Sequence, residues 1–565
     1  MKNKNNARKK AQRSLSDFES DLYKNAYHDS DYQHTIKFYF SNHFSRIHAE
    51  LENFGNEVTN RLEPLANENN LSCNLPRIEK YNPVGECIDH IIHHPTYEEA
   101  GKIIYKTGLL KKLAHSGLLE CLSFFFLASQ AGEAGHNCPI ACSAGMIRVL
   151  QKIAPFPGKD YYLERLTDHD FATNFTGAQF LTEIQGGSDV ALNTTYALQE
   201  KDNIWRIYGE KWFCSNAGAD LFFITARFDQ EISGTKGLGL FLIPAKWQGN
   251  KNHFMLRRLK NKIGTRSMAT AEIDFQGAYA FQIGSNEEGF HFVMNDVLHL
   301  SRLFNAVCVL GMVRRAYHIA LSYAKHRVVF SSPIIHYPLV LENLARIKSE
   351  NTAMISAIFA TAKLQDDHDK NKLSNETSLL LRLLVNLQKY FSALLSFDHI
   401  HRCIDVLAGN GMIETFSPLP RLLRDCMVCE NWEGTHNVLR MQIFKDIFKY
   451  NIDKIYLAFI HDEIKKIQQC QQSHILIKKL NMLEKELQHF RQKEIDLQTL
   501  HIRFIVDSMA HLYCALKLLI EALDQNKSSS TSKLDCYYYF CKIYIEEKHV
   551  QYDKDYLQLI NRIVL

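Results

Sequence analysis

The chain has 565 residues, of which 46% are hydrophobic and 23% charged, an ordinary globular composition with enough mass for three to four packed units. A net charge of +4 excludes a global basic field for collecting nucleic acid, so any such binding must be local. No uninterrupted apolar run approaches the roughly 20 residues of a membrane span, and we expect no signal peptide. The 14 scattered cysteines indicate reduced thiols and a cytoplasmic protein.

The opening segment is basic and poor in apolar residues. Its first acid is Asp17, and the cations before it are Lys2, Lys4, Arg8, Lys9, Lys10 and Arg13. Because so little apolar surface cannot offset the entropy of ordering, we predict a disordered basic arm over residues 1–35.

Apolar residues then recur at helical spacing from about Phe38 to Ile153, most clearly in 117–131 and 139–153. This pattern predicts an all-helical first domain over residues 36–177. The apolar stretch 123–128 is too short to cross a membrane and is interpreted as part of a buried helix.

The pattern changes after Pro155 and Pro157. Alternating β-branched and aromatic residues, separated by Gly and Asn or Asp, predict a β-domain over residues 178–285. Its clearest strands are expected at 204–208, 221–226, 240–243 and 271–275.

Helical periodicity returns at Gly289, and long helices with short connections predict a bundle over residues 286–450. The helical stretches are 302–329, 338–364, 378–408 and 432–459. We expect the polar insert 365–371 to be an exposed turn.

A C-terminal helical extension covers residues 451–565 and is divided by the run Ser528–Ser532. Leu480, Leu483, Leu487 and Phe490 form one apolar stripe, which favours an antiparallel helix pair packed on the main body over a free coiled coil. The predicted fold class is therefore α+β and mostly helical.

Three short motifs carry the strongest functional signal. In the first, residues 181–190, Gly186 and Gly187 free backbone N–H groups, and Thr182 and Ser188 add hydroxyls. Such a loop suits a flavin ring and its pyrophosphate.

The second motif is Gly-Glu-Lys-Trp-Phe-Cys-Ser at 209–215, and the third is Asn-Trp-Glu-Gly-Thr at 431–435. The third presents the carboxylate of Glu433 beside Gly434, where a ligand can approach the backbone closely. Each motif alone could be a polar turn, but three in one order are difficult to explain by chance.

Together these motifs resemble the flavin and acid–base apparatus of the acyl-CoA dehydrogenases. The resemblance covers nearly the whole chain and implies a helical N-terminal domain, a β-barrel-like middle domain and a helical bundle, here with an added C-terminal helical domain. Residues 182–189, 211–213, 259–264 and 432–434, with that added domain, look like the AidB branch, the adaptive-response alkylation-protection flavoproteins.

The resemblance implies FAD, an acyl-CoA or related thioester substrate, a homotetramer and the following residue roles. Glu433 would be the catalytic base and Arg302 a substrate contact, while the electron acceptor is not indicated. The cofactor contacts would be Leu181, Thr182, Gly186, Gly187, Ser188, Phe213, Cys214, Ser215, Thr435 and Asn437, with Arg327 and Gly409 reaching the cofactor of a neighbouring subunit.

Dehydrogenation beside a thioester needs a base for the α-proton and an acceptor for the β-hydride, so one carboxylate and one flavin suffice. In many isovaleryl-type and long-chain members the base lies just before the arginine matched by Arg302. That place is taken here by Ser301, so Glu433 is the only candidate. Departures at His299, Ser331, His336, Tyr337 and Ala408 bear more on acyl-CoA turnover than on FAD binding.

Other suggestive clusters are interpreted as structural, and no metal site is predicted. They are Cys426 with Cys429, Cys87 with His90, His93 and His94, and the pairs Glu433 with His436 and Glu486 with His489. From Ile460 onward there are about fifteen basic and fourteen acidic residues, which is no net basic footprint for duplex DNA. Lys465, Lys466, Lys478 and Lys479 could form a local basic patch, but a solvated helix face is the favoured interpretation.

The leading hypothesis is an FAD-dependent acyl-CoA dehydrogenase-like oxidoreductase. The alternative is an AidB-type flavoprotein with a nucleic-acid-associated protective role and weak or no acyl-CoA turnover. A third is an interaction protein that retains FAD only as a folding element. No membrane association is expected.

Overall fold

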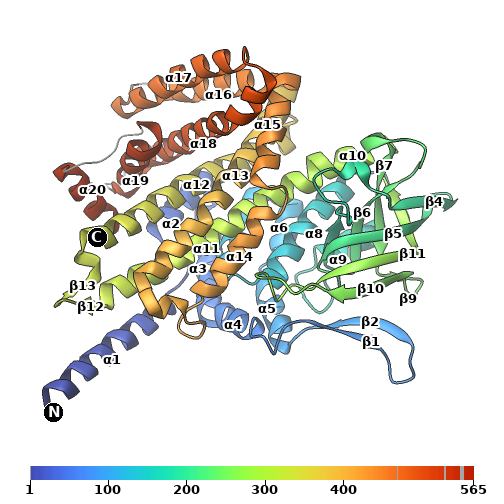
Figure 1. The fold of residues 1–565 in the computed structure, drawn as a ribbon, viewed down its shortest axis with the longest axis horizontal. Coiled ribbons are helices and arrows are strands. Elements are labelled where there is room, and N and C mark those ends of the chain that lie inside the picture. The colour runs from blue at the N-terminus through green and yellow to red at the C-terminus, as the bar shows by residue number, and fades with distance from the viewer. Residues whose placement is uncertain (1, 468, 527–529, 547–552) are drawn as a thin grey trace. The chain divides into compact units, whose positions relative to one another are not determined.

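The computed structural model describes residues 2–467, 469–526, 530–546 and 553–565, which form two compact units (Figure 1). The first unit combines Met1–Arg61, Ser129–Ala131 and Asn305–Leu565, and the second combines Leu62–Ala128 and Gly132–Phe304. The predicted fold class, mostly helical with one sheet region, is confirmed.

The second unit contains a seven-stranded sheet whose order is β10-β11-β5-β4-β6-β3, with β7 pairing both β11 and β6. Strands β5, β4, β6, β7 and β11 therefore pair in a closed ring, as the expected barrel-like domain requires. The strands are β3 (Gly177–Phe180), β4 (Tyr196–Lys201), β5 (Ile204–Ser215), β6 (Leu221–Arg227), β7 (Leu238–Pro244), β10 (Phe254–Leu259) and β11 (Thr270–Ile283).

All four predicted strands lie inside these elements. Alternation places Ile207, Ile224, Phe241 and Ile273 in one buried cluster, which is the core of the sheet. A short hairpin of β8 (Lys246–Trp247) and β9 (Asn250–Lys251) follows β7.

The prediction of an all-helical first domain is wrong at one place, where β1 (Arg77–Tyr81) pairs with β2 (Cys87–Ile92). The fully buried carboxylate of Asp89 lies 2.7 Å from Lys80 Nζ and 2.9 Å from Lys251 Nζ, and it accepts the Leu256 N–H at 2.9 Å. These tertiary contacts stabilise two strands that are too short to give a periodic signal.

Helices make up the rest of the second unit, and the predicted helices at 117–131 and 139–153 are confirmed. They are α4 (Glu63–Asn69), α5 (Pro95–Tyr105), α6 (Leu109–His115), α7 (Leu118–Ala131), α8 (Ala134–Lys152), α9 (Lys159–Leu166), α10 (Gly289–Phe292), the π-helix η5 (Val293–Val297) and the start of α11 (Leu298–His326), with a 3-10 turn η3 (Val190–Leu192) and η4 (Gly234–Gly237).

The first unit is a bundle of long helices, as predicted. It contains α12 (Pro338–Asn371), α13 (Asn375–Leu407), α14 (Leu419–Asn431) and α15 (His436–Tyr450), together with most of α11. The predicted exposed turn at 365–371 is wrong, because α12 continues to Asn371. Gln365 is buried and donates to Asp369 one turn later at 2.8 Å, so side-chain pairing within the helix supports the polar segment.

The predicted disordered arm is also helical, as α1 (Lys2–Leu22) and α2 (Ser30–Phe40) (Figure 1). The ring of Phe18 stacks on Phe416 at 5.5 Å and meets Tyr323 edge-on at 5.4 Å. The carboxylate of Asp21 accepts hydrogen bonds from Ser322 and His326. Partners distant in the sequence thus supply the burial that the local composition lacks.

The C-terminal extension packs on the same bundle through α16 (Ile452–Lys466), α17 (His474–Phe490), α18 (Ile495–Gln525), α19 (Ser532–Phe540), the π-helix η10 (Cys541–Ile545) and α20 (Lys554–Val564). All four residues of the predicted stripe are buried where α17 contacts α16 and α18. This agrees with packed helices rather than a free coiled coil. Of the predicted serine run, Ser528 and Ser529 lie outside the described residues.

The remaining elements of the first unit are short or peripheral. They are α3 (Phe44–Glu57), the π-helix η2 (Val58–Leu62), the 3-10 turns η1 (Ser41–His43), η6 (Ile334–His336), η7 (Ala408–Met412) and η8 (Gln471–Ser473), and the strands β12 (Val328–Val329) and β13 (Ser332–Pro333).

Within the described residues, one helical stretch, Gly289–His326, is long and apolar enough to cross a membrane by length and composition. Its most apolar window is 89% buried inside the protein, which is how a core helix of a bundle looks.

Candidate functional site

The glycine-rich loop follows β3 and is fixed at its base. Glu183 and Gly186 form an isolated bridge, in which the Gly186 N–H donates to the Glu183 carbonyl at 3.0 Å. The Trp212 N–H donates to the Thr182 carbonyl at 2.9 Å, so the loop is tied to β5. This connects the first two sequence motifs.

Gly187 forms a cradle that any side chain would fill. A Cβ on Gly187 would lie 2.3 Å from Thr182 Oγ1, a distance that real Cβ atoms do not show. Gly186 has a φ of +136°, a region that L-residues avoid, and open space beside it. The hydroxyl-bearing residues Thr182 and Ser188 are accessible on this loop. These features fit a phosphate or flavin edge approaching the backbone.

A buried ion pair that sequence reasoning missed lies beneath this loop. The side chains of Glu183 and Lys211 are fully buried, and Oε1 and Nζ are 2.8 Å apart. Lys211 also donates to the Leu181 carbonyl at 3.2 Å, and Glu183 accepts the backbone N–H groups of Thr194 at 2.6 Å and Thr195 at 3.1 Å. Burial alone would raise the pKa of Glu183, but the ammonium and these donors lower it to about 2.

The second motif ends β5 with a β-bulge. Lys211 faces Ile273 and Cys214 faces Ala271, so two residues of β5 oppose one of β11. Phe213 remains 52% exposed and Ser215 half-buried, whereas the Cys214 side chain lies in the sheet core. The prediction that Cys214 contacts the cofactor can therefore hold only for its backbone.

A cation lies against this aromatic edge. Lys260 Nζ is 3.6 Å from the centre of the Trp212 ring and 4.8 Å from that of Phe213, while it pairs with Glu272 at 2.8 Å. The ring of Phe213 is thus held in place without being covered, which suits stacking on a planar ligand.

The predicted substrate contact Arg302 is buried in the second unit, as is His299 one turn earlier on α11. Ser301 accepts a hydrogen bond from Gln179 Nε2 at 2.9 Å, so its hydroxyl is already engaged. Arg302 lies on the same helix, and its side chain is buried rather than open to solvent.

In the first unit, the third motif forms a tight turn between α14 and α15. Glu433 has a φ of +59° and Gly434 a φ of +107°, so a non-glycine residue occupies a left-handed conformation. The Glu433 side chain is half-buried, as expected for a base. Thr435 is the N-cap residue of α15, and both Thr435 and Asn437 are exposed.

Arg327 and Gly409 also lie in the first unit. Arg327 precedes the β12–β13 hairpin, whose two-residue turn is Phe330 (φ +49°) and Ser331 (φ +69°), a type I′ pattern. Among the described residues, the Arg327 guanidinium forms no ion pair. Gly409 is exposed with open space beside its Cα, and the preceding Ala408 has a φ of +52°.

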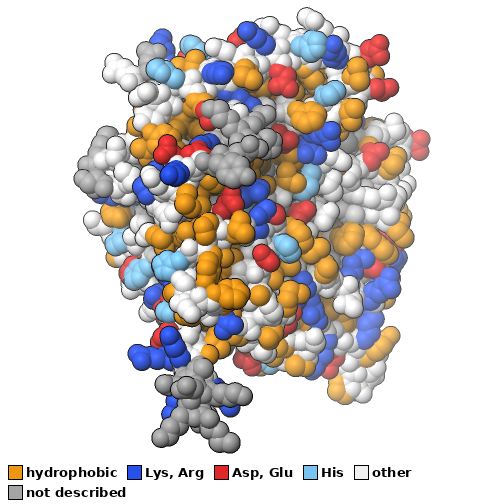
Figure 2. Space-filling view, turned by 60° about the vertical axis from the view of Figure 1, so that its left-hand side comes forward, with side chains coloured by type: hydrophobic (Ala, Val, Ile, Leu, Met, Phe, Trp, Pro, Cys, Tyr) orange, Lys and Arg blue, Asp and Glu red, His pale blue; other side chains and the backbone are white. Residues whose placement is uncertain are grey.

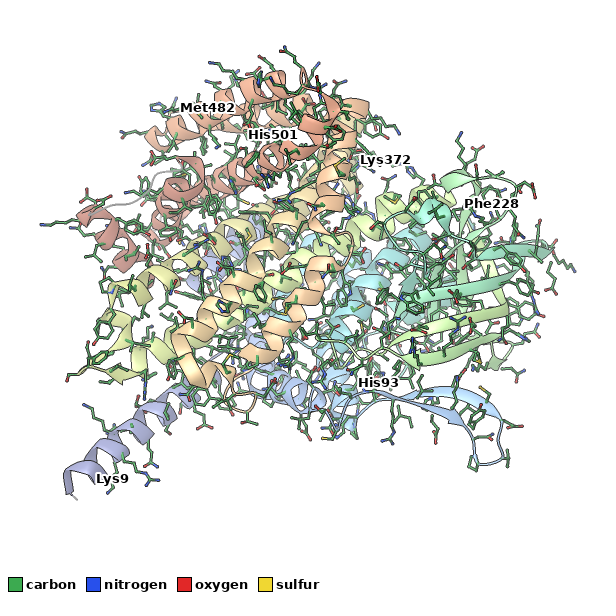
Figure 3. The ribbon with its side chains drawn as sticks, viewed as in Figure 1. Lys9, His93, Phe228, Lys372, Met482 and His501 are labelled. Atoms are coloured by element: carbon green, nitrogen blue, oxygen red, sulfur yellow. The ribbon has the colours of Figure 1, made fainter. Side chains whose placement is uncertain are left out.

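The clusters interpreted as structural do not converge. Cys426 and Cys429 are buried on α14, where burial raises the pKa of Cys426. His93, which is labelled in Figure 3, stacks on Tyr97 with ring centroids 3.9 Å apart, and burial lowers the pKa of His93 to about 4. Among the described residues, no group of three or more His, Cys, Asp or Glu is placed to hold a metal ion.

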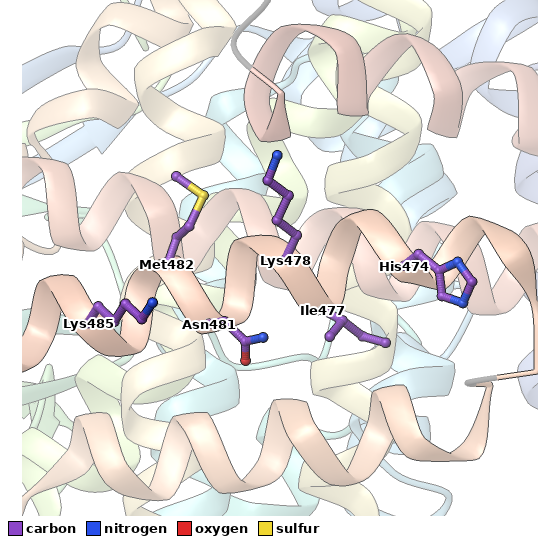
Figure 4. Close-up of a pocket in the computed structure, with 6 residues that line it drawn as sticks. All are labelled: His474, Ile477, Lys478, Asn481, Met482 and Lys485. Carbon is purple, nitrogen blue, oxygen red and sulfur yellow. The ribbon is translucent and has the colours of Figure 1, made fainter.

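The four C-terminal lysines do not all lie exposed and unpaired on the surface. Lys479 is buried, Lys466 pairs with Glu463, and only Lys478 of the α17 pair is exposed. Lys478 lines a surface hollow of about 430 Å³ on one face of α17 (Figure 4). Its lining residues are His474, Ile477, Lys478, Asn481, Met482 and Lys485, which include no carboxylate and no Phe, Tyr or Trp ring to orient a ligand.

A closed ring of strands bearing a glycine cradle, combined with a bundle of long helices, defines the acyl-CoA dehydrogenase fold. A solved structure of Caenorhabditis elegans ACDH-11 in complex with C11-CoA matches it with a TM-score of 0.85 and 25% identity, covering 93% of this chain and 92% of that one.

Sequence comparisons agree with this fold. Residues 178–278 match the acyl-CoA dehydrogenase middle domain, and residues 287–448 match the acyl-CoA dehydrogenase C-terminal domain. Acyl-CoA dehydrogenase family member 11 of Caenorhabditis elegans is 28% identical over 88% of this chain and 84% of its own length. AidB of Escherichia coli (strain K12) is 29% identical over 66% of this chain and 70% of its own length. The chain therefore carries the middle and C-terminal domains of the acyl-CoA dehydrogenases, which are oxidoreductases acting on CH–CH groups.

Proposed function

We propose that this protein is an FAD-dependent acyl-CoA dehydrogenase that introduces a double bond next to an acyl thioester. The observation that carries the proposal is the Gly187 cradle, where backbone, the Thr182 hydroxyl and the ring of Phe213 are available to a planar, phosphate-bearing cofactor. FAD would be held by this loop and by Ser215, and when bound it supplies the acceptor for the hydride from the substrate β-carbon.

The chain's own contribution to the chemistry is the carboxylate of Glu433. It removes the proton from the substrate α-carbon, and the electron pair of that C–H bond becomes part of the new double bond as the β-hydride leaves. The left-handed turn at Glu433 presents the carboxylate at the apex of the α14–α15 connection. The match of residues 287–448 to the acyl-CoA dehydrogenase C-terminal domain supports this assignment of Glu433.

The test is anaerobic mixing of the purified holoprotein with acyl-CoA esters of graded chain length while flavin absorbance is followed. ACDH-11 of Caenorhabditis elegans was solved with C11-CoA, so we expect bleaching with esters near that length. No bleaching with any ester, in a preparation that contains FAD, would contradict the proposal.

We further propose that two or more copies assemble through the end of the bundle that carries Arg327 and Gly409. Phe330 is 90% exposed and Met412 is 70% exposed in this unit, and a contact between copies would bury such apolar side chains. A tetramer remains our expectation, and light scattering of the holoprotein tests it. We also keep the proposal of a cytoplasmic location.

One observation favours the AidB-type alternative as a second candidate. Arg8, Lys9, Lys10 and Arg13 are exposed on α1 and form no ion pair with described residues, and Figure 3 shows Lys9 pointing away from the body. Figure 2 shows Lys and Arg side chains gathered at this helix. Salt-dependent binding of duplex DNA, lost on neutralising these four residues, would support a nucleic-acid-associated role.

A further inference from the structure

Lys389 of α13 is a buried cation whose position is explained by the turn that carries Glu433. The side chain is fully buried, and its Nζ donates to the carbonyls of Glu430 at 2.9 Å and Gly434 at 2.7 Å. These two carbonyls lie three residues before Glu433 and one residue after it. One ammonium group therefore closes the turn from both sides, with Glu433 at its apex.

Both acceptors need such a donor. The Glu430 carbonyl belongs to the last turn of α14, where helix carbonyls lack partners within the helix. The Gly434 carbonyl belongs to a residue with a φ of +107°, outside any regular hydrogen-bonding ladder. A buried ammonium is costly unless such acceptors are fixed around it, so the lysine and the turn stabilise each other.

The left-handed φ of Glu433 also indicates that the surroundings hold this turn in place. Non-glycine residues stay in such conformations only where the surroundings over-determine them, and these places are often functional. Here the over-determination comes from Lys389 on a 33-residue helix that is buried along most of its length. The long helix makes the anchor rigid.

The next residue on α13 fixes the far end of the same segment. The Tyr390 hydroxyl accepts a hydrogen bond from Arg440 of α15 and donates to Asp507 of α18 at 2.5 Å. The Tyr390 ring also meets His436 edge-on at 5.7 Å. Adjacent residues of one helix thus hold the segment from Glu430 to Arg440, and Asp507 ties it to the C-terminal extension.

We propose that Lys389 is a positioning residue for the base Glu433, acting through the backbone carbonyls of Glu430 and Gly434. The proposal rests on the proposed function, because only a base needs its carboxylate fixed to this degree. A displacement of about 1 Å at a reacting group can slow a reaction roughly hundredfold.

The test compares Lys389→Met with Lys533→Met. Lys533 is a matched control, because it is equally buried in the same unit, where it contacts Thr35 at 2.6 Å and pairs with Glu521. Two readouts are taken on holoprotein: hydrogen–deuterium exchange of the peptide covering Trp432–Leu439, and the rate of flavin reduction at saturating acyl-CoA.

We expect Lys389→Met to speed exchange in this peptide at least about tenfold and to slow flavin reduction between about tenfold and a hundredfold. The half-saturating acyl-CoA concentration and the FAD content should stay within about twofold of wild type. Lys533→Met should change global stability but neither readout.

Equal effects of the two variants on both readouts, or a change only in half-saturation, would overturn the positioning role. If wild-type flavin is not reduced by any acyl-CoA, the proposed function fails by itself. The exchange readout then still decides whether Lys389 fixes the turn, and unchanged exchange in Lys389→Met would overturn that too.

Discussion

Replacing Lys211 with methionine removes one half of the buried ion pair under the glycine-rich loop. Glu183 would stay fully buried with only its hydrogen-bond donors, and the Leu181 carbonyl would lose one of its two side-chain partners, keeping Asn193 at 2.8 Å. Leaving one charge of a buried pair uncompensated costs about 3–5 kcal/mol. We therefore expect Lys211→Met to lower the free energy of unfolding of its unit by about this amount.

Urea titration, followed by tryptophan fluorescence, measures the effect. With a slope of about 3 kcal/mol per molar, at the top of the usual range, the unfolding midpoint should fall by at least about 1 M. Lys102→Met is the control. Lys102 pairs with Glu99 in the same unit, but the Lys102 side chain is more than half exposed and the Glu99 side chain is half exposed. That variant should change stability by less than about 1 kcal/mol.

The pH dependence of stability provides an independent check. The pKa of Glu183 is about 2 in the folded protein against an ordinary 4.5, so the folded state gains stability above pH 4.5 and loses it as the pH falls toward 2. The difference corresponds to about 3 kcal/mol. This loss should shrink in Lys211→Met.

The double variant Glu183→Gln with Lys211→Met completes the cycle. Because no buried charge is left, we expect it to be less destabilised than the sum of the single changes by about 1–3 kcal/mol. Additive effects, or a Lys211→Met midpoint equal to that of Lys102→Met, would refute the argument that this pair stabilises the loop.

Three further predictions concern the cofactor and the base. Gly187→Val, alone or with Ser188→Ala, should abolish FAD retention because its side chain would collide with Thr182, and a yellow variant with wild-type FAD content would contradict this. Arg327→Glu should weaken both FAD retention and self-association by replacing an attraction to phosphate with a repulsion; a monomer that holds FAD tightly would count against it. Glu433→Gln should keep the flavin spectrum but slow its reduction by acyl-CoA at least about hundredfold, and an unchanged rate would require another base.

The sequence was sufficient for elements whose signal is local and repeated. The strands 204–208 and 221–226 alternate strongly, and the helices at 117–131 and 139–153 have long apolar faces, so all four were predictable. The residues of α1 gave the wrong answer because Phe18 is buried by Tyr323 and Phe416, about 300 or more residues later. Local composition cannot report such partners.

The candidate site likewise contains residues that the sequence indicates and residues that it does not. Gly187 and Glu433 are predicted as site residues from sequence motifs and stay predictions, whereas Lys211 and Lys389 were not assigned a role. Lys211 lies inside the second motif, where a β-bulge interrupts the regular alternation of buried and exposed side chains between Lys211 and Cys214. Only the pairing of β5 with β11 reveals this bulge. Lys389 lies in a helical stretch, where a lone lysine is ordinarily solvent-exposed. Its burial depends on tertiary packing, which the local sequence does not show.

Ala408 departs from the family pattern, and the strain in its backbone conformation can be tested. The resemblance places it where acyl-CoA dehydrogenases have the first of two glycines. Its φ of +52° with a ψ of −133° is a backbone conformation that glycine adopts readily and alanine does not. Its N–H donates to the Asp405 carbonyl and ends α13, so the conformation is imposed by the helix end.

Such strain costs about 1–3 kcal/mol, while glycine costs about 0.5–1 kcal/mol more than alanine in lost chain entropy on folding. Ala408→Gly should therefore stabilise the first unit by about 1 kcal/mol, which urea titration can resolve against a buried control on the same helix. Ala393→Gly, at a fully buried helical position, should instead destabilise by about 1 kcal/mol. If both variants are destabilised alike, alanine is not strained at position 408, and the local departure from the family's glycine has no energetic consequence.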